Sequence, residues 1–122
     1  MKKHLIVEIA DNPMSLAKGL MGRKDMPFDH GMLFKFPSIT NASFWGKNTY
    51  IPLDIAFVDK DNKICSIRHI TPMSTKMVNG GFGYTMAIET NQGFFKDNNI
   101  HEGHIVEVTN SEKQIKVVFR DK

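Results

Sequence analysis

The chain has 122 residues, of which 41% are hydrophobic and 24% are charged, and its formal net charge is +3. This composition is that of an ordinary globular protein and disfavours disorder, collagen and coiled coil, and the length predicts a single domain over residues 1–122. Because the basic residues are spread along the chain rather than gathered in an arm, we expect no nucleic-acid partner.

The N-terminal segment predicts a strand, because Leu5, Val7 and Ile9 are apolar at every second position. Glu8 interrupts this segment, so it does not have the pattern of a signal peptide. No stretch of the sequence approaches the roughly 18 apolar residues that a membrane-spanning helix needs. We therefore expect a cytoplasmic protein with no membrane span.

A short helix is predicted next, since Asn12 followed by Pro13 is typical of a helix start. An apolar stripe continues to about Met21, and Gly22 is the expected end of the helix. A second helical turn, containing Phe94 and Phe95, is expected after Asn91.

Several later segments have strand patterns. They are residues 31–36, stopped by Pro37, and residues 43–45, 51–59, 63–70, 84–90, 104–109 and 114–120. The connections between them are too short for repeated helical crossovers, which argues against a parallel sheet. The sequence therefore predicts a mainly β fold, a compact antiparallel β-sandwich or partly closed barrel with two short helices. Within it, Leu53, Ile55 and Phe57 should share a face, and Ile115, Val117 and Phe119 should point into a core.

Three candidate chemical motifs are better explained by structure. Residues 59–62 begin like a calcium loop, but isoleucine stands where that loop needs its glycine and its final glutamate, so a hairpin turn is expected. His101 and His104 are placed on a loop, and no metal site or cofactor is expected. Cys65 is the only cysteine, and its apolar surroundings are those of a buried residue rather than a nucleophile.

The segment from Trp45 to Asp54 is the strongest candidate for a binding site. It contains the only tryptophan together with Lys47, Asn48, Thr49 and Asp54, which are an aromatic plane, a cation, an amide, a hydroxyl and a carboxylate. These groups suit recognition of a small ligand. The alternative is a tight corner whose polar side chains bind the backbone of an irregular turn.

At these residues the sequence resembles the domain-of-unknown-function 192 family. The resemblance rests on residues 19–23, 31–34, 44–45, 47–49 and 51–57, with weaker matches at Pro72, residues 87–89, Gly93 and Gly103. It implies a compact, jelly-roll-like β fold and brings no established activity. Many members carry a secretion or lipoprotein signal, and this chain shows none.

The sequence departs from the family pattern at two places. Gly46 stands where relatives usually have methionine, which implies open space beside Trp45. Ser74 and Thr75 stand in a stretch that often holds cysteines in relatives, so the resemblance supports no redox or metal role for this loop.

Two acidic residues are predicted near the middle of strands. Asp54 and Glu89 each share a strand face with small side chains, which leaves room around their carboxyl groups. Since a buried carboxylate needs a partner or a ligand, we expect at least one of them in a concave pocket, paired with Arg23 or Lys47. An ordinary structural ion pair is the alternative.

Two classes of function remain open from the sequence. The first is a domain that binds a small polar ligand, such as a saccharide or a carboxylate, through Arg23, Trp45, Lys47, Asn48, Thr49, Asp54 and Glu89. The second is a hydrolase or lyase that uses Asp54 or Glu89 as acid or base, with Lys47 stabilising charge. A purely structural or interaction role is also open, and the sequence indicates neither an oligomeric state nor whether the protein is an enzyme.

Overall fold

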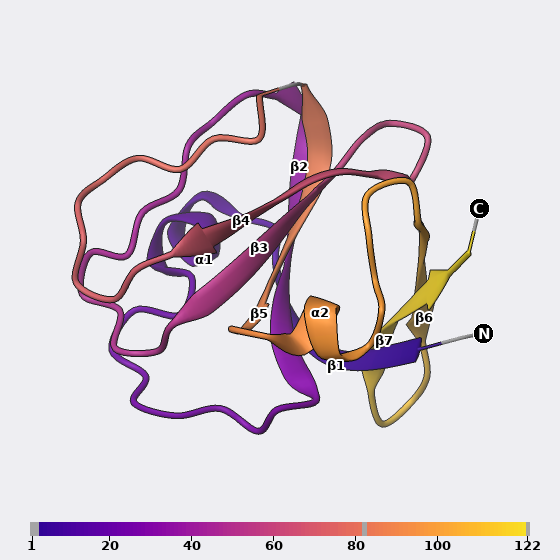
Figure 1. Cartoon of the computed structure of the whole chain (residues 1–122), viewed down its shortest axis with the longest axis horizontal. Coiled ribbons are helices and arrows are strands. Elements are labelled where there is room, and N and C mark those ends of the chain that lie inside the picture. The colour runs from indigo at the N-terminus through magenta and orange to yellow at the C-terminus, as the bar shows by residue number, and fades with distance from the viewer. Residues whose placement is uncertain (1–2, 82, 122) are drawn as a thin grey trace.

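The computed structural model describes residues 3–81 and 83–121, and its strands form one seven-stranded sheet in the order β4-β3-β5-β2-β1-β7-β6 (Figure 1). The strands are β1 (Lys3–Ala10), β2 (His30–Thr40), β3 (Leu53–Val58), β4 (Ile64–Ile70), β5 (Tyr84–Asn91), β6 (Ile105–Asn110) and β7 (Ile115–Arg120). The helices are α1 (Pro13–Lys18) and α2 (Phe94–Asp97). Only β1 and β2 pair in parallel among these neighbours, so the predicted mainly antiparallel β fold with two short helices is confirmed.

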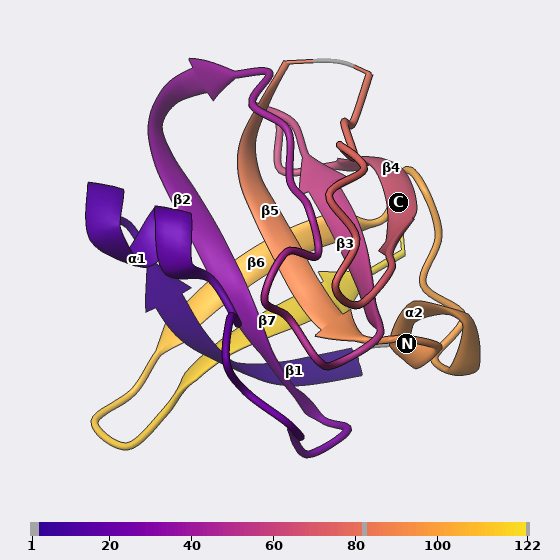
Figure 2. The same ribbon diagram turned by 90° about the vertical axis from the view of Figure 1, so that its left-hand side faces the viewer.

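The sheet curls until its two edge strands meet at one end. An isolated bridge joins Lys63 to Ile105, which lie beside β4 and within β6. The Ile64 amide donates to the His104 carbonyl at 2.9 Å, and the Gly103 amide donates to the Ile64 carbonyl at 2.8 Å. The remaining length of the two edges does not pair among the described residues. The partly closed barrel expected from the sequence is therefore the observed architecture, and Figure 2 shows β6 and β7 crossing behind the β2–β5 pair.

Both faces of strand β3 are buried, because side chains pack on each side of the sheet. Leu53, Ile55 and Phe57 share one face with one another, as predicted, and Ala56 and Val58 point to the other. The concave core on the second face also includes both phenylalanines of α2 and the expected residues of β7, with Ile115 packed at its border: Phe94, Phe95, Val117 and Phe119. The first face is covered by the region around α1 and by two long connections, residues 41–52 and 71–81 (Figure 1).

The predicted helix end was wrong by several residues. Helix α1 ends at Lys18 and is capped by Gly19, whose φ of +50° is in the left-handed region that glycine tolerates best. The Gly19 amide donates to the Ser15 carbonyl at 3.0 Å, which closes the last turn. Gly22, the end expected from the sequence, lies in the connection that follows.

Two predicted strand bounds were also wrong. Strand β2 continues through Pro37 to Thr40. The pairing with β5 shifts register between Lys35 and Thr40, so the sheet needs no hydrogen bond from Pro37, which has no backbone N–H. The expected strand at residues 43–45 is reduced to one bridge, between Phe44 and Val78. In the described part of the chain, no helix is long and apolar enough to cross a membrane.

Candidate functional site

A large, mainly apolar groove lies on the face of the sheet that α1 covers. Its volume is about 1180 Å³, comparable with the pockets of roughly 300–1,000 Å³ that take small molecules. Three segments line it: residues 12–21, with α1; the β2 residues Phe34 and Phe36; and the connection through Ala42, Ser43, Phe44, Trp45 and Thr49. Met77 and Glu89 complete the lining.

One wall of the groove is built by the residues that form α1. The Asn12 side chain accepts the Ser15 amide at 2.9 Å, and the Ser15 hydroxyl accepts the Asn12 amide at 3.2 Å, which completes a capping box. Proline at the first helical position supports the same start. These local interactions stabilise a helix of only six residues, none of which is fully buried.

The opposite wall is the segment from Ala42 to Trp45, and it is anchored at several points. The Tyr84 hydroxyl donates to the Ala42 carbonyl, and burial raises the pKa of Tyr84 to about 12. The Phe44 and Val78 backbones exchange two hydrogen bonds, at 2.8 and 2.7 Å. This wall is therefore fixed to the sheet although it has no strand of its own.

Glu89 of β5 lies at the floor of the groove. Only 4% of the residue is exposed, and the described residues supply no hydrogen bond or ion pair to its carboxyl group. Burial removes the carboxylate from water without a compensating charge, and it raises the pKa of Glu89 to about 8. An unpartnered carboxyl group that opens onto a groove is a candidate contact for a ligand.

The expected pairing of Asp54 or Glu89 with Arg23 or Lys47 was wrong, because both cations make other contacts. The Arg23 guanidinium pairs with Glu8 through two hydrogen bonds, and this contact lowers the pKa of Glu8. The Lys47 ammonium lies over the Trp45 ring, 5.2 Å from its centroid. Glu8 thus takes the arginine that the sequence assigned to the buried acids.

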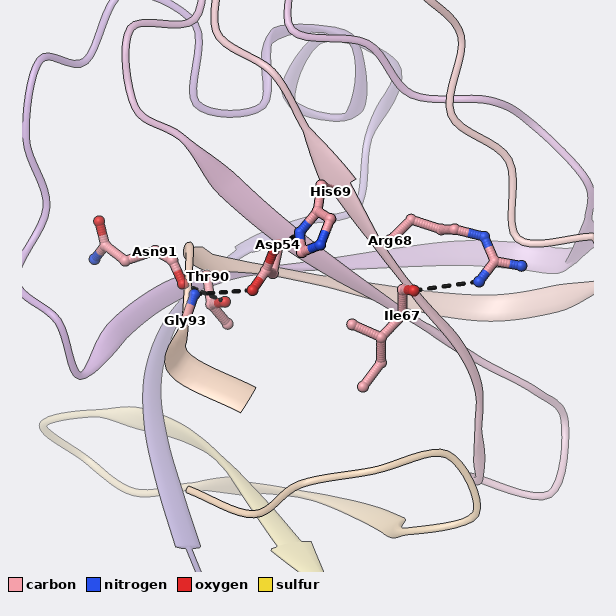
Figure 3. A network of polar contacts seen from close by, with 7 residues as sticks. All are labelled: Asp54, Ile67, Arg68, His69, Thr90, Asn91 and Gly93. Carbon is pink, nitrogen blue, oxygen red and sulfur yellow. Dashed lines mark hydrogen bonds and ion pairs between the residues drawn. The ribbon is translucent and has the colours of Figure 1, made fainter. Parts of the chain in front are cut away.

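Asp54 is the second acid expected in a pocket, and it is paired on the other face of the sheet. The β3–β5 register places Ile55 opposite Glu89 and Thr90 opposite Asp54, so the two carboxyl groups point to opposite faces. Asp54 accepts the Gly93 amide at 2.9 Å and pairs with the His69 ring (Figure 3). It therefore ties β3 to β4 and to the start of α2.

His69, the partner of Asp54, borders a smaller cleft of about 430 Å³. The Asp54 side chain is buried, whereas 72% of the His69 side chain is exposed, with Nδ1 turned toward the carboxylate. This arrangement fixes the ring and leaves Nε2 outward, as in a general base. Ser74 and Thr71 also line the cleft, but in the described part of the chain neither hydroxyl makes a hydrogen bond to His69.

The structure brings together three of the seven residues assigned to a ligand site. Trp45, Thr49 and Glu89 line the groove, and 38% of Trp45 is exposed at its rim. Thr49 is buried, and its hydroxyl donates to the Lys47 carbonyl at 3.3 Å. The other four lie outside the lining: Arg23, Lys47, Asn48 and Asp54.

Two features show that the corner around Trp45 packs tightly against neighbouring segments of backbone. Asn48 has a φ of +58°, and its carbonyl accepts the Gly22 amide at 2.8 Å. The open space expected at Gly46 was wrong, since a Cβ added there would lie 1.9 Å from the Thr71 carbonyl oxygen. Gly46 is needed because two backbones pass in contact.

The sequence reasoning missed most of the groove. Phe34, Phe36 and Phe44 were assigned only to strands, and α1 was treated as an ordinary amphipathic helix. The feature that marks the groove appears only in the structure: Met14 of the six-residue helix α1 is 84% exposed, and the exposed Met77 also lines the groove. Exposed apolar side chains that flank a groove are typical of a binding surface.

The remaining motifs have the structural roles expected. The Asp59 carboxylate accepts the amides of Asp61 at 2.8 Å and Lys63 at 3.0 Å, which is a hairpin turn. His104 accepts the His101 amide through Nδ1 and pairs with Asp121 through Nε2. Cys65 was expected to be buried and is only partly so; desolvation is still the main cause of its raised pKa, as fits an unreactive thiol.

Comparison with known proteins places these features in a family. The model of the DUF192 family, described as "Uncharacterized ACR", matches residues 1–108. The chain belongs to the DUF192 family. The resemblance seen in its sequence is thereby confirmed, and the comparison with curated proteins finds no match.

Two crystal structures share the fold of this DUF192 protein. One is of a protein from Sinorhizobium meliloti 1021 described as a candidate transcription regulator, with 32% identity, a TM-score of 0.79, and coverage of 84% of this chain and 90% of that one. The other is of a protein of unknown function from Novosphingobium aromaticivorans DSM 12444, with 32% identity, a TM-score of 0.80, and coverage of 83% and 73%. Both support the arrangement of the DUF192 sheet and carry no activity with them.

Proposed function

We propose that this protein is a binding domain for a small molecule with an apolar body, which occupies the groove between α1 and residues 42–49. The observation that carries the proposal is Glu89, a buried carboxyl group that opens onto the groove and has no partner among the described residues. Burying such a group without a hydrogen-bond partner lowers the stability of the folded protein, and a ligand that binds the group offsets this cost.

The lining supports an apolar ligand rather than a saccharide. Phe34, Phe36 and Phe44 contribute aromatic rings to the groove, and Leu16 and Leu20 contribute aliphatic groups. A saccharide needs several hydrogen-bonding side chains. A carboxylate ligand would meet a like charge wherever Glu89 is ionised. The proposed site is therefore the groove beside the Trp45–Asp54 segment, and Trp45 and Thr49 are the residues of that segment that line it.

A hydrolase or lyase that uses both acids has less support. Asp54 and Glu89 point to opposite faces of the sheet, and Lys47 lies over Trp45 rather than beside either carboxyl group. General acid–base catalysis needs its groups within hydrogen-bond reach of one substrate. The groove therefore favours binding over catalysis by this pair.

Trp45 gives a direct test, because it is the only tryptophan and stands at the rim of the groove. Titration with 1-octanol, an uncharged apolar probe, should change the intrinsic fluorescence in a saturable way. The same probe should raise the melting temperature, since a ligand of the folded state stabilises it.

A blocking variant makes the test specific. Ala17→Phe places a ring on the exposed groove side of α1 and should weaken binding of 1-octanol at least tenfold. Lys96→Phe adds the same ring to an exposed position of α2, outside the groove lining, and should bind as the unmodified protein does. Equal binding by the two variants, or no saturable binding at all, would refute the proposed function.

A further inference from the structure

The floor of the groove holds an acid that no neighbouring cation neutralises. Burial is the single cause of the raised pKa of Glu89, so no charged side chain of the described residues offsets it. The residues that flank it in the sheet, Met32 of β2 and Ile55 of β3, are apolar. The site thus offers two acceptor oxygens and, once ionised, a full negative charge.

Besides Glu89, three charged side chains lie in or near the groove: Lys18, Glu8 and Arg23. Lys18 of α1 also lines the groove, is exposed, and makes no ion pair in the described part of the chain. Glu8 of β1 points to the same face and is neutralised by Arg23. No resident cation is therefore committed to Glu89.

The rest of the lining favours a positive charge beside a hydrocarbon body. Phe34 and Glu89 both lie close to Gly19, where an added Cβ would lie 3.3 Å from the phenylalanine ring and 3.9 Å from the carboxyl oxygen. Aromatic faces attract cations, and the Lys47 ammonium over Trp45 is an example in this molecule. Aliphatic and aromatic groups beyond this point suit an alkyl or aryl chain.

We propose that the groove takes an apolar primary amine, whose ammonium group donates hydrogen bonds to the Glu89 carboxylate while its hydrocarbon part lies along α1 and Phe44. This inference rests on the proposed function and names its ligand class. An alcohol of the same length fills the groove without supplying a charge. A carboxylic acid of that length brings a second negative charge to the floor.

Binding of the amine should release a proton. Below pH 8 the empty site holds Glu89 mainly as the neutral acid, and the ammonium selects the carboxylate. Affinity should therefore rise about tenfold for each pH step of one between pH 6 and pH 8, and then level off. The rise ends before the amine itself loses its proton, since an alkylammonium like that of lysine titrates near 10.4.

The experiment compares octylamine, 1-octanol and octanoate by isothermal titration calorimetry at pH 6.0 and pH 8.5. Octylamine should bind at least tenfold more tightly than 1-octanol at pH 8.5, and its advantage should shrink by more than tenfold at pH 6.0. Glu89→Gln should remove both the preference and the pH dependence while still binding 1-octanol. Glu112→Gln, at an exposed turn outside the groove, is the matched control.

The outcomes separate this inference from the proposed function. Equal binding of octylamine and 1-octanol would overturn the amine inference and leave the apolar groove standing. Tighter binding of octanoate would overturn it as well. If none of the three probes binds, both proposals fall. The comparison of the three probes on the unmodified protein decides the question even if Glu89→Gln folds poorly.

Discussion

The buried carboxyl group of Glu89 should make the stability of the folded protein fall as pH rises. Its pKa is about 8 in the folded state, against an ordinary value of 4.5, because burial disfavours the charged form. As the pH rises, the unfolded chain therefore loses this proton at a lower pH than the folded protein does. Stability from this group is fully present below pH 4.5, falls between 4.5 and 8, and is constant above 8.

The size of the effect follows from the two pKa values. Each pH step of one between them costs about 1.4 kcal/mol, so the free energy of unfolding should drop by about 3 kcal/mol between pH 6 and pH 9. This window avoids the region near pH 4, where the lowered pKa of Glu8 acts in the opposite direction.

Glu89→Gln is the perturbation that isolates this effect, since glutamine keeps the shape and cannot ionise. Urea unfolding of both proteins at pH 6 and pH 9 gives four free energies of unfolding. The difference between variant and unmodified protein should shift by about 3 kcal/mol in favour of the variant at pH 9. Glu112→Gln should show no such shift. Parallel pH dependence of the Glu89→Gln and unmodified proteins would refute the assignment of Glu89 as a buried, unpartnered acid.

Three further substitutions test the roles of nearby residues by urea unfolding. Lys47→Ala should cost less than about 1 kcal/mol, because an exposed cation–π contact is worth about 0.5–1 kcal/mol, and a larger loss would make Lys47 a structural residue. Asp54→Ala should cost about 1–3 kcal/mol by leaving the Gly93 amide unpaired, and an unchanged midpoint would contradict that role. Gly46→Ala should cost about 1–3 kcal/mol or more through collision with the Thr71 carbonyl, and full stability would show that the two backbones can separate.

The fold was predictable because alternation is a local property. Leu53, Ile55 and Phe57 follow one another at the strand period, and most connections are too short for helical crossovers, so the strands and the mainly antiparallel sheet could be predicted from the sequence. The parallel pairing of β1 with β2, across the connection that contains α1, could not be predicted in this way. The end of β2 could not be predicted, because whether the strand continues past Pro37 depends on a register shift against β5, which lies far along the chain.

The same limit explains the error over the two acids. Alternation within a strand shows that Asp54 shares a face with Ala56, and that Glu89 shares one with Ala87. Which of these faces coincide depends on the register between β3 and β5, and β4 and a long connection separate the two in sequence. A shift of one residue would have placed both carboxyl groups in one site. Register of this kind is fixed by packing across the whole sheet.

The groove was hidden for a related reason, since its parts come from α1, β2 and a connection that has no regular structure. Each part has an ordinary local explanation: a capped helix, a buried strand, a turn around Gly46. Only their assembly leaves Glu89 facing apolar space. The Trp45 corner gave a partial indication, because Trp45 and Thr49 contribute to one wall of the groove.

The cost of Glu89 to the fold is itself an argument that the groove has an occupant. A leucine or methionine at this position would satisfy the apolar surroundings, whereas the carboxyl group loses its hydration and gains no protein partner among the described residues. A buried acid can be explained by the groups that bind it within the protein, as Asp54 is explained by His69 and the Gly93 amide. Glu89 has no such explanation within the described chain. Departures from local consistency of this kind concentrate at functional sites, where binding recovers the free energy that folding has lost.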